Sequence, residues 1–231
     1  MSIEQWDLAA EQYTAGQEQS EFANLNKQIV IKRFSNLQNK TVLDLGCGYG
    51  WYTDYFKKIG ATVIGCDGSS KMIYFAKNKY ANIEFNEVDF CKQLPYDDNR
   101  FDLVFCNQVL MDLADIPHLI KEVNRVMKNN GIFYMSIVHP AFYDCHWGQD
   151  DTGFCKTKIM ERYLSEYSFD NEFWGETIHY HRTISHYINI IIGSGFVLKC
   201  LNEPKSYDGT IKSDEFPLFL FAEFEKANSV K

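Results

Sequence analysis

The sequence has no run of basic residues, and its overall charge is acidic. Its 31 Asp and Glu outnumber 23 Lys and Arg, which gives a formal net charge of −8. Because an acidic chain repels a phosphate backbone, we expect no nucleic-acid partner. The sequence also lacks a signal-peptide pattern, and its most apolar late stretch, YINIIIGSGFVL, is too short and glycine-broken to span a bilayer. We therefore expect a soluble, cytoplasmic protein with no membrane partner.

No C-x-x-C motif occurs among the seven cysteines. Their odd number and their positions near the ends of apolar runs favour buried free thiols in a reducing compartment. His139, Cys145 and His146 lie close together in the sequence, but their spacing matches no standard zinc site. We therefore expect neither disulfides nor a bound metal.

Internal repeats and low-complexity segments are absent, and strand and helix patterns alternate instead. Apolar runs predict strands over 41–46, 61–67, 83–90, 101–108 and 132–139, and later over 196–203 and 216–226. Helical patterns cover 20–36, 51–60, 69–79, 116–131 and 182–195. This order predicts one α/β domain over 1–231, with a largely parallel sheet covered on both faces. The aromatic-rich stretch 140–180 breaks the alternation, and we interpret it as a cap insertion over the sheet.

The stretch TVLDLGCGYG, residues 41–50, leads the first strand into a glycine-rich loop. In open α/β sheets, ligands bind outside the carboxyl ends of the strands, where the strand order reverses. Glycines allow the backbone to approach a ligand closely, and the next helix offers its N-terminus to an anionic group. The pattern G-x-G-x-G differs from the dinucleotide fingerprint G-x-G-x-x-G, and such loops also occur without a ligand.

Acidic residues end three successive predicted strands. Asp44 would favour a cationic ligand group, and Asp67 would accept hydrogen bonds from ribose hydroxyls. Asp89 would accept a bond from an adenine amino group, with Phe90 beside the ring. Each acid alone could equally cap a turn or a helix. Three of them on one edge of a sheet favour a binding site.

These residues resemble a known family. LDLGCGYG, GCDGSSKMI, VDF, FDLVFCNQVL and VMKNNGIFYMSIVHP are similar, in this order over about 38–140, to the motifs of class I S-adenosylmethionine-dependent methyltransferases. The subgroup that they resemble is the small-molecule type 11 methyltransferases, and WDLAAEQY and HYHRTISHYINIIIGSGF resemble it too. The resemblance implies a doubly wound seven-stranded sheet of order 3-2-1-4-5-7-6 with strand 7 antiparallel. The turn KNNG at 128–131 departs from the K-P-G-G of many relatives.

The resemblance also implies that S-adenosylmethionine is the cofactor and that a helical segment over 1–37 covers it. The implied cofactor-binding residues are Tyr13, Asp44, Gly46, Cys47, Gly48, Asp67, Gly68, Ser69, Met72, Asp89, Phe90, Asn107 and Gln108. Methyl transfer from a sulfonium is an in-line displacement, so the protein mainly has to align the reactants and exclude water. A general base is needed only when the acceptor carries a proton.

His139, at the end of the fifth strand, is the candidate general base, although a histidine there could simply cap the strand end. The aromatic residues of 140–180 would wall a pocket for a small-molecule acceptor, or form the core of the cap, or both. His179 and His181 alternate onto one face of a short strand, which could also face solvent. The candidate acceptor-binding residues are Met111, His139, Tyr143, Trp147, Trp174 and His179.

Features of the sequence disfavour other function classes. A nicotinamide dehydrogenase is disfavoured by Asp44 before the glycine loop and by the lack of a Tyr-x-x-x-Lys pair. A DNA amino-methylase would carry N-P-P-Y where this chain has FCNQVL. A non-catalytic S-adenosylmethionine-binding regulatory module is the alternative to the enzyme. The acceptor, the atom that is methylated and the oligomeric state, including a homodimer, stay open.

Overall fold

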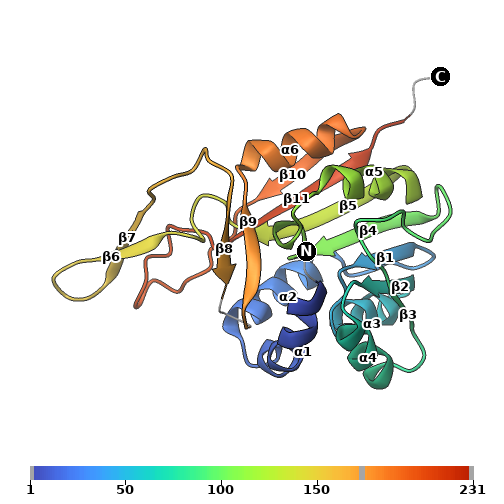
Figure 1. Ribbon diagram of the computed structural model, residues 1–231, viewed down its shortest axis with the longest axis horizontal. Coiled ribbons are helices and arrows are strands. Elements are labelled where there is room, and N and C mark those ends of the chain that lie inside the picture. Colours follow the sequence, from blue (N-terminus) through green and yellow to red (C-terminus); the bar gives the residue numbers. More distant parts are fainter. Residues whose placement is uncertain (1–2, 172–174, 229–231) are drawn as a thin grey trace.

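A seven-stranded sheet forms the centre of the protein, for which a computed structural model describes residues 3–171 and 175–228 (Figure 1). Its strands are β1 Thr41–Leu45, β2 Thr62–Asp67, β3 Glu84–Glu87, β4 Phe101–Asn107, β5 Met127–Val138, β10 Phe196–Asn202 and β11 Phe219–Lys226. They lie in the order β10-β11-β5-β4-β1-β2-β3, and β11 is antiparallel to both of its neighbours. The predicted order 3-2-1-4-5-7-6 with an antiparallel last strand is confirmed.

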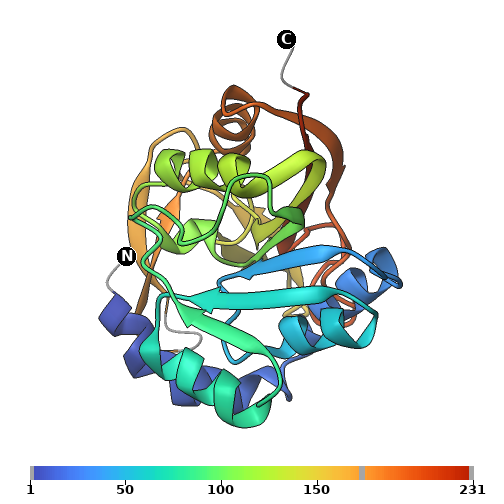
Figure 2. The ribbon, with the colours of Figure 1, turned by 90° about the vertical axis from the view of Figure 1, so that its right-hand side faces the viewer.

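Helices cover both faces of this sheet, as expected for strands that are apolar on both sides. They are α1 Ile3–Gln17, α2 Glu21–Arg33, α3 Trp51–Lys58, α4 Ser70–Lys79, α5 Pro117–Val126 and α6 Ile184–Gly193, with a short 3-10 helix, η1, at Leu110–Asp112. Val42 of β1 packs in a core with side chains of α2 and α3, while its neighbour Leu43 packs in a core with α5 and α6. Figure 2 shows the strands between helices on either side.

Two predicted element boundaries are wrong. The helix expected over 116–131 ends at Val126, and the chain enters β5 at once, so that Gly131 lies inside the strand. Met127 pairs with Phe101 of β4, and its carbonyl accepts a hydrogen bond from Lys226 Nζ at 2.8 Å, so tertiary pairing overrides the helical pattern. The third strand is shorter than expected, because only Glu84–Glu87 pairs with β2.

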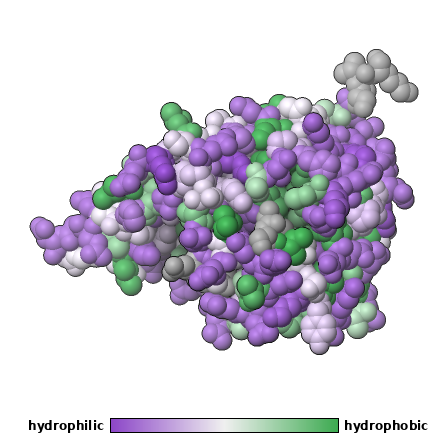
Figure 3. Space-filling model, viewed as in Figure 1, coloured by the Kyte–Doolittle hydropathy of each residue, from purple (hydrophilic) through white to green (hydrophobic). Residues whose placement is uncertain are grey.

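The aromatic-rich stretch after β5 contains two small antiparallel hairpins rather than helices. β6 His146–Gln149 pairs with β7 Cys155–Ile159, and β8 Tyr167–Asn171 pairs with β9 Thr177–His181. The β6–β7 hairpin projects from the molecule, and the segment 203–218 runs beside it (Figure 1). Two backbone hydrogen bonds join them: Cys155 N–H to Ile211 O at 3.0 Å and Ser213 N–H to Cys155 O at 2.9 Å. Figure 3 shows the projecting part as mostly hydrophilic.

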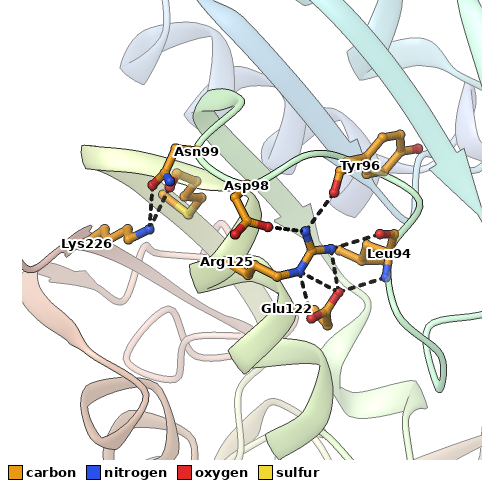
Figure 4. A network of polar contacts seen from close by, with 8 residues as sticks. Leu94, Tyr96, Asp98, Asn99, Glu122, Arg125 and Lys226 are labelled. Carbon is orange, nitrogen blue, oxygen red and sulfur yellow. Dashed lines mark hydrogen bonds and ion pairs between the residues drawn. The ribbon is translucent and has the colours of Figure 1, made fainter.

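A polar network holds the connection between β3 and β4 against α5 (Figure 4). Arg125 donates hydrogen bonds to the carbonyls of Leu94 and Tyr96 at 2.9 and 2.8 Å, and pairs with Asp98 and Glu122, both at 2.7 Å. Arg125 comes just before β5 begins and Asp98 just before β4 begins, so the network stabilises the amino ends of these strands, at the edge of the sheet away from their carboxyl ends.

All seven cysteines are free thiols, although Cys91 and Cys200 are exposed rather than buried. Within the described residues, no helix combines the length and the apolar character that a bilayer span requires.

Candidate active site

A cavity of about 230 Å³ lies at the carboxyl edge of the sheet. A water molecule needs only about 10–15 Å³ of such space, so the cavity has room for ligands of many atoms. Its walls come from the end of β2 and the loops after β1, β3 and β4, from α1, α2, α4 and η1, from the stretch after β5, and from the segment 203–218. The predicted site residues that line it are Tyr13, Gly46, Gly48, Asp67, Met72, Phe90, Asn107, Gln108, Met111, Tyr143 and His179.

The glycine loop is fixed by close packing around it. Gly46 has φ 78°, and a Cβ there would lie 2.2 Å from Val109 Cγ2. Gly48 has φ 53°, and a Cβ there would point toward the Tyr13 ring of α1 at 3.6 Å. Both positions therefore require glycine: each has a positive φ, and at Gly46 there is also no space for a Cβ. The loop backbone at Gly48 and the Tyr13 ring therefore lie side by side where they line the cavity.

Asp67 stands at the end of β2 with its carboxylate held in place. Its Oδ2 accepts a hydrogen bond from Gly48 N–H and its Oδ1 one from Ser69 N–H, both at 2.9 Å. Burial raises the pKa of Asp67, although these backbone bonds partly oppose the shift. A carboxylate oxygen can accept more than one hydrogen bond, so Asp67 can still receive donors from a ligand in the cavity.

Two amides at the end of β4 are also fixed. Gln108 donates from Nε2 to Ser136 Oγ at 3.0 Å, and the Ser136 hydroxyl donates to Asn107 Oδ1 at 2.6 Å. Gln108 has φ 58°, which is unusual for a residue with a side chain and often marks a functional site. Sequence reasoning found both amides but missed Ser136, which is fully buried one strand away.

Several predicted cofactor residues do not line the cavity: Asp44, Cys47, Gly68, Ser69 and Asp89. Ser69 caps α4 by accepting Met72 N–H, and its hydroxyl donates to Asp7 of α1 at 2.6 Å. Asp89 accepts Cys91 N–H at 3.0 Å and pairs with Lys92 at 3.2 Å, as a turn carboxylate does. Contact of these residues with the cofactor stays a prediction.

Three buried carboxyl groups give this region its electrostatic character: Asp44, Asp67 and Asp112. Asp44 lies beneath the glycine loop, where its Oδ2 accepts a hydrogen bond from Thr53 Oγ1 at 2.6 Å and burial raises its pKa to about 7. Burial also raises the pKa of Asp112 well above its usual value, and the charge of Asp67 adds to the shift at both Asp44 and Asp112. A positively charged ligand would relieve this repulsion, so the site suits a cation.

Asp112 of η1 belongs to a buried polar cluster that also contains His179 and Asn171. Its Oδ1 lies 3.1 Å from His179 Nε2, and Asn171 Nδ2 lies 3.2 Å from the same nitrogen. Asn171 Oδ1 accepts the Tyr143 hydroxyl at 2.8 Å. Because the Asn171 amide nitrogen donates to His179 Nε2, this ring nitrogen carries no hydrogen to donate to Asp112. Among the described residues, neither Asp112 Oδ1 nor His179 Nδ1 therefore has a hydrogen-bond partner, although both atoms are buried. Such atoms are costly unless a ligand group pairs with them.

His179 is only 4% exposed, so the reading in which its strand faces solvent is wrong. Burial lowers its pKa to about 4, which leaves the ring uncharged at neutral pH. His181 is buried too, and its Nε2 donates to the Tyr163 carbonyl at 2.8 Å. Sequence reasoning missed Asp112, for which the only signal was an acid inside the apolar run VLMDL just after the fourth strand.

His139 lies outside this cavity. Its Nδ1 accepts Ala141 N–H at 3.1 Å, so its Nε2 carries the hydrogen and donates to Glu203 at 2.8 Å. The side chain is 1% exposed. Because both ring nitrogens have protein partners, this geometry suits a histidine that caps the end of β5. General-base catalysis by His139 stays a prediction, and this geometry does not favour it.

The remaining predicted acceptor residues have different surroundings. Trp147 of β6 stands behind the cavity wall, edge-on to Tyr207 and Phe216 with ring centroids 5.4 and 5.6 Å away. Trp174 lies outside the described residues. Sequence reasoning missed Tyr207 and Lys212, which line the cavity from the segment 203–218. Sequence reasoning had no signal for this segment, because it forms no helix or strand and so has no periodic apolar pattern.

Comparison with known proteins agrees with this architecture. Residues 43–135 match a family model described as "Methyltransferase domain". A candidate S-adenosylmethionine-dependent methyltransferase from Listeria monocytogenes has a crystal structure that is 27% identical, covers 87% of this chain and 97% of its own, and has a TM-score of 0.74. An S-adenosylmethionine-dependent methyltransferase from Mesorhizobium loti has the same fold, with 24% identity, 91% and 100% coverage and a TM-score of 0.76.

Relatives with a named activity match a shorter region. Malonyl-[acyl-carrier protein] O-methyltransferase from Buchnera aphidicola is 32% identical over 117 residues, which cover 50% of this chain and 47% of that protein. The chain matches about half the length of such relatives.

The fold and the family model define the class of this protein as the class I S-adenosylmethionine-dependent methyltransferases. Within that class, residues 43–135 resemble the methyltransferase domain that the family model describes. S-adenosylmethionine is therefore the cofactor, and the site fits it. The buried carboxyl groups suit a ligand with a sulfonium and an ammonium group, and Asp67 can receive hydroxyl donors.

Proposed function

We propose that the protein transfers a methyl group from S-adenosylmethionine to a small-molecule acceptor. The observation that carries this proposal is that one cavity joins two different polar sites. One contains the glycine loop and Asp67, and the other contains the buried Asp112 and His179 atoms without protein partners. A protein that only bound the cofactor would need the first site but not the second.

We call the first site the donor wall: Gly46, Gly48, Asp67, Met72, Phe90, Asn107 and Gln108. Asp67 would accept hydrogen bonds from the ribose hydroxyls, with Met72 and Phe90 beside the base. Asn107 and Gln108 would bind the methionyl end. When bound, S-adenosylmethionine supplies a methyl group on a positively charged sulfur whose leaving group is neutral. The residues of the donor wall therefore have to orient the ligand and need not donate a proton to it.

We call the second site the acceptor wall: Met111, Asp112, Tyr143, Asn171, His179, Tyr207 and Lys212. Asn171 donates to His179 Nε2, which leaves the hydrogen of the neutral ring on Nδ1. An acceptor hydroxyl between the two unpaired atoms would accept from His179 Nδ1–H and donate to Asp112 Oδ1. Because burial raises the pKa of Asp112, its ionised form binds a proton more strongly than an exposed carboxylate does. Asp112 would thus accept the proton, and His179 would orient the acceptor.

The N-terminal helices and the stretch after β5 would exclude water from the cavity. Tyr13 of α1 lies over Gly48, and α1 is joined to α4 through Asp7 and to β9 through a hydrogen bond from Ile178 N–H to Gln5 Oε1 at 3.3 Å. These contacts tie the covering elements together over the cavity. A closed, dry site favours displacement at a sulfonium.

The alternative is a regulatory module that binds S-adenosylmethionine without catalysis. That reading would be favoured if the aromatic residues after β5 filled the space beside the cofactor site. The cavity between the two walls argues for an acceptor instead.

Calorimetry with S-adenosylmethionine, S-adenosylhomocysteine and NAD tests the donor side, and we expect binding of the first two only. Transfer of a labelled methyl group to pooled small metabolites tests the acceptor side. Tight cofactor binding with no labelled product from any pool would favour the regulatory module. Binding of NAD in place of S-adenosylmethionine would overturn the proposal as a whole.

A further inference from the structure

The acceptor end of the cavity contains a positive charge that the proposed chemistry does not use. Of the described residues that line the cavity, Lys212 is the only Lys or Arg. Two carboxyl groups line the same space: Asp67 ends β2, and Asp112 ends η1. The chain as a whole carries a net charge of −8, so a lone lysine facing its cavity is not explained by a general excess of bases.

The backbone on both sides of Lys212 is fixed. Cys155 of β7 donates its N–H to the Ile211 carbonyl at 3.0 Å, and its carbonyl accepts a hydrogen bond from Ser213 N–H at 2.9 Å. These bonds attach the segment 203–218 to the β6–β7 hairpin at this one position. The base of the Lys212 side chain is therefore held at the cavity rim by the sheet of the hairpin.

A second lysine lies against the same aromatic group. Lys158 Nζ stands 4.3 Å from the centroid of the Trp147 ring, and Lys212 Nζ stands 5.9 Å from it. Lys212 also lies 5.5 Å from the centroid of Tyr207. Cation–π contact of this kind orients an ammonium group and leaves its hydrogen-bond donors available.

Neither ammonium group has a carboxylate partner among the residues that the structure describes. Lys158 Nζ donates a hydrogen bond to the Cys145 carbonyl at 3.3 Å. The nearby acids have other partners, since Asp214 pairs with Lys205 and Asp208 accepts hydrogen bonds from Thr210. Burial lowers the pKa of Lys158, and the charge of Lys212 adds to this shift, so the two lysines repel each other. An anion between them would relieve that repulsion.

We propose that Lys212, supported by Lys158 and Trp147, binds an anionic group of the acceptor, most simply a carboxylate. This inference rests on the proposed function and deepens it, because it names the class of acceptor. Such a molecule would place its hydroxyl at Asp112 and His179 and its carboxylate at Lys212, at the end of the cavity away from the cofactor's positive charge. The acceptor would then be a hydroxy acid, with flat apolar parts against Tyr143 and Tyr207.

Binding of a set of hydroxy acids, each paired with its own amide, tests this assignment. The set contains aromatic and aliphatic members, such as 4-hydroxybenzoate with 4-hydroxybenzamide, and each is titrated into the protein saturated with S-adenosylhomocysteine. We expect at least one acid to bind more tightly than its amide, and its affinity to fall as salt is raised. If no acid of the set binds more tightly than its amide, the proposal is wrong.

Variants then locate the charge that is responsible. Lys212→Met removes the ammonium group and keeps most of the apolar stem, and it should weaken the acid by roughly tenfold or more while leaving the amide unchanged. Lys212→Arg should retain most of the preference. Lys205→Met is the matched control, because Lys205 lies in the same segment but pairs with Asp214 at the surface. Equal effects of Lys212→Met and Lys205→Met would overturn the assignment.

Cofactor affinity, measured by calorimetry on the same samples, separates the two proposals. If the protein binds S-adenosylmethionine normally but binds no acid more tightly than its amide, only the anion site is contradicted. Absence of S-adenosylmethionine binding in the unmodified protein contradicts the proposed function itself.

Discussion

The donor wall and the acceptor wall enclose the same cavity, yet they differ in origin and in charge. The donor wall consists of short loops at the ends of neighbouring parallel strands, and its residues from Gly46 to Gln108 fall inside the region 43–135 that the family model matches. Most of the acceptor wall comes from the stretch after β5 and from the segment 203–218, which lie outside that region. The comparison teaches that the part of this chain that matches the family model contains the donor wall, whereas most of the acceptor wall lies outside it.

Asp112 offers the strongest test of this division. Asp112→Asn keeps the shape but removes the proton acceptor, so turnover with a hydroxyl acceptor should fall by about 100-fold or more. Cofactor affinity should change far less, and stability should hold, because an amide relieves a buried carboxyl group. Steady-state kinetics and calorimetry measure both effects. Asp115→Asn, an exposed acid of the same loop, is the control; equal turnover in the two variants would remove Asp112 from the mechanism.

Asp67→Asn should have the opposite selectivity. Loss of hydrogen bonds to an ionised carboxylate should weaken S-adenosylmethionine by about 1.5–3 kcal/mol, or roughly 10–150-fold. Calorimetry measures this affinity. Asp89→Asn is the matched control, because Asp89 also follows a strand of the sheet but does not line the cavity. A larger loss from Asp89→Asn than from Asp67→Asn would show that the donor wall is assigned to the wrong acids.

A pair of variants can separate the role of His179, which lines the acceptor wall, from that of His139, which lies outside the cavity. His179→Gln should lower turnover about 2- to 12-fold through the loss of one orienting hydrogen bond, with little effect on folding. His139→Gln should instead reduce the thermal midpoint, because Ala141 N–H and Glu203 lose their buried partner. Turnover per folded molecule and melting curves distinguish these results. A large loss of turnover in folded His139→Gln would restore His139 as the base.

A pH dependence provides the smallest but most direct test of the charge on the buried carboxyl groups Asp44 and Asp67. Raised carboxyl pKa values, about 7 for Asp44, mean that these groups are protonated at low pH and ionised at high pH. A cation prefers the ionised forms, so affinity for S-adenosylmethionine should rise with pH relative to S-adenosylhomocysteine, which has no sulfonium. We expect a change of about a few-fold between pH 6 and 8, measured by calorimetry. A constant ratio of the two affinities would show that the carboxyl groups do not sense the sulfonium charge.

The sequence by itself determined the sheet and the donor wall. Apolar runs, helix caps such as Ser69, and acids after successive strands depend on contacts close in the chain, and parallel strands place their carboxyl ends at one edge. The same local reasoning failed at Met127, where pairing with Phe101 of β4 ends the helix early. It also could not separate Asp67, whose carboxylate faces the cavity, from Asp89, which turns back to its own loop.

Only the tertiary structure decided the acceptor wall. The sequence predicted His139 as the base and His179 only as an acceptor-binding residue, but the role of each depends on which partners reach its ring nitrogens: Glu203 and Ala141 for His139, Asp112 and Asn171 for His179. Lys212 acquires its place only because an irregular segment is joined to Cys155, more than fifty residues earlier in the chain. Such contacts leave no periodic pattern, because they join single residues that are far apart in sequence, and burial and charge at the site follow from them.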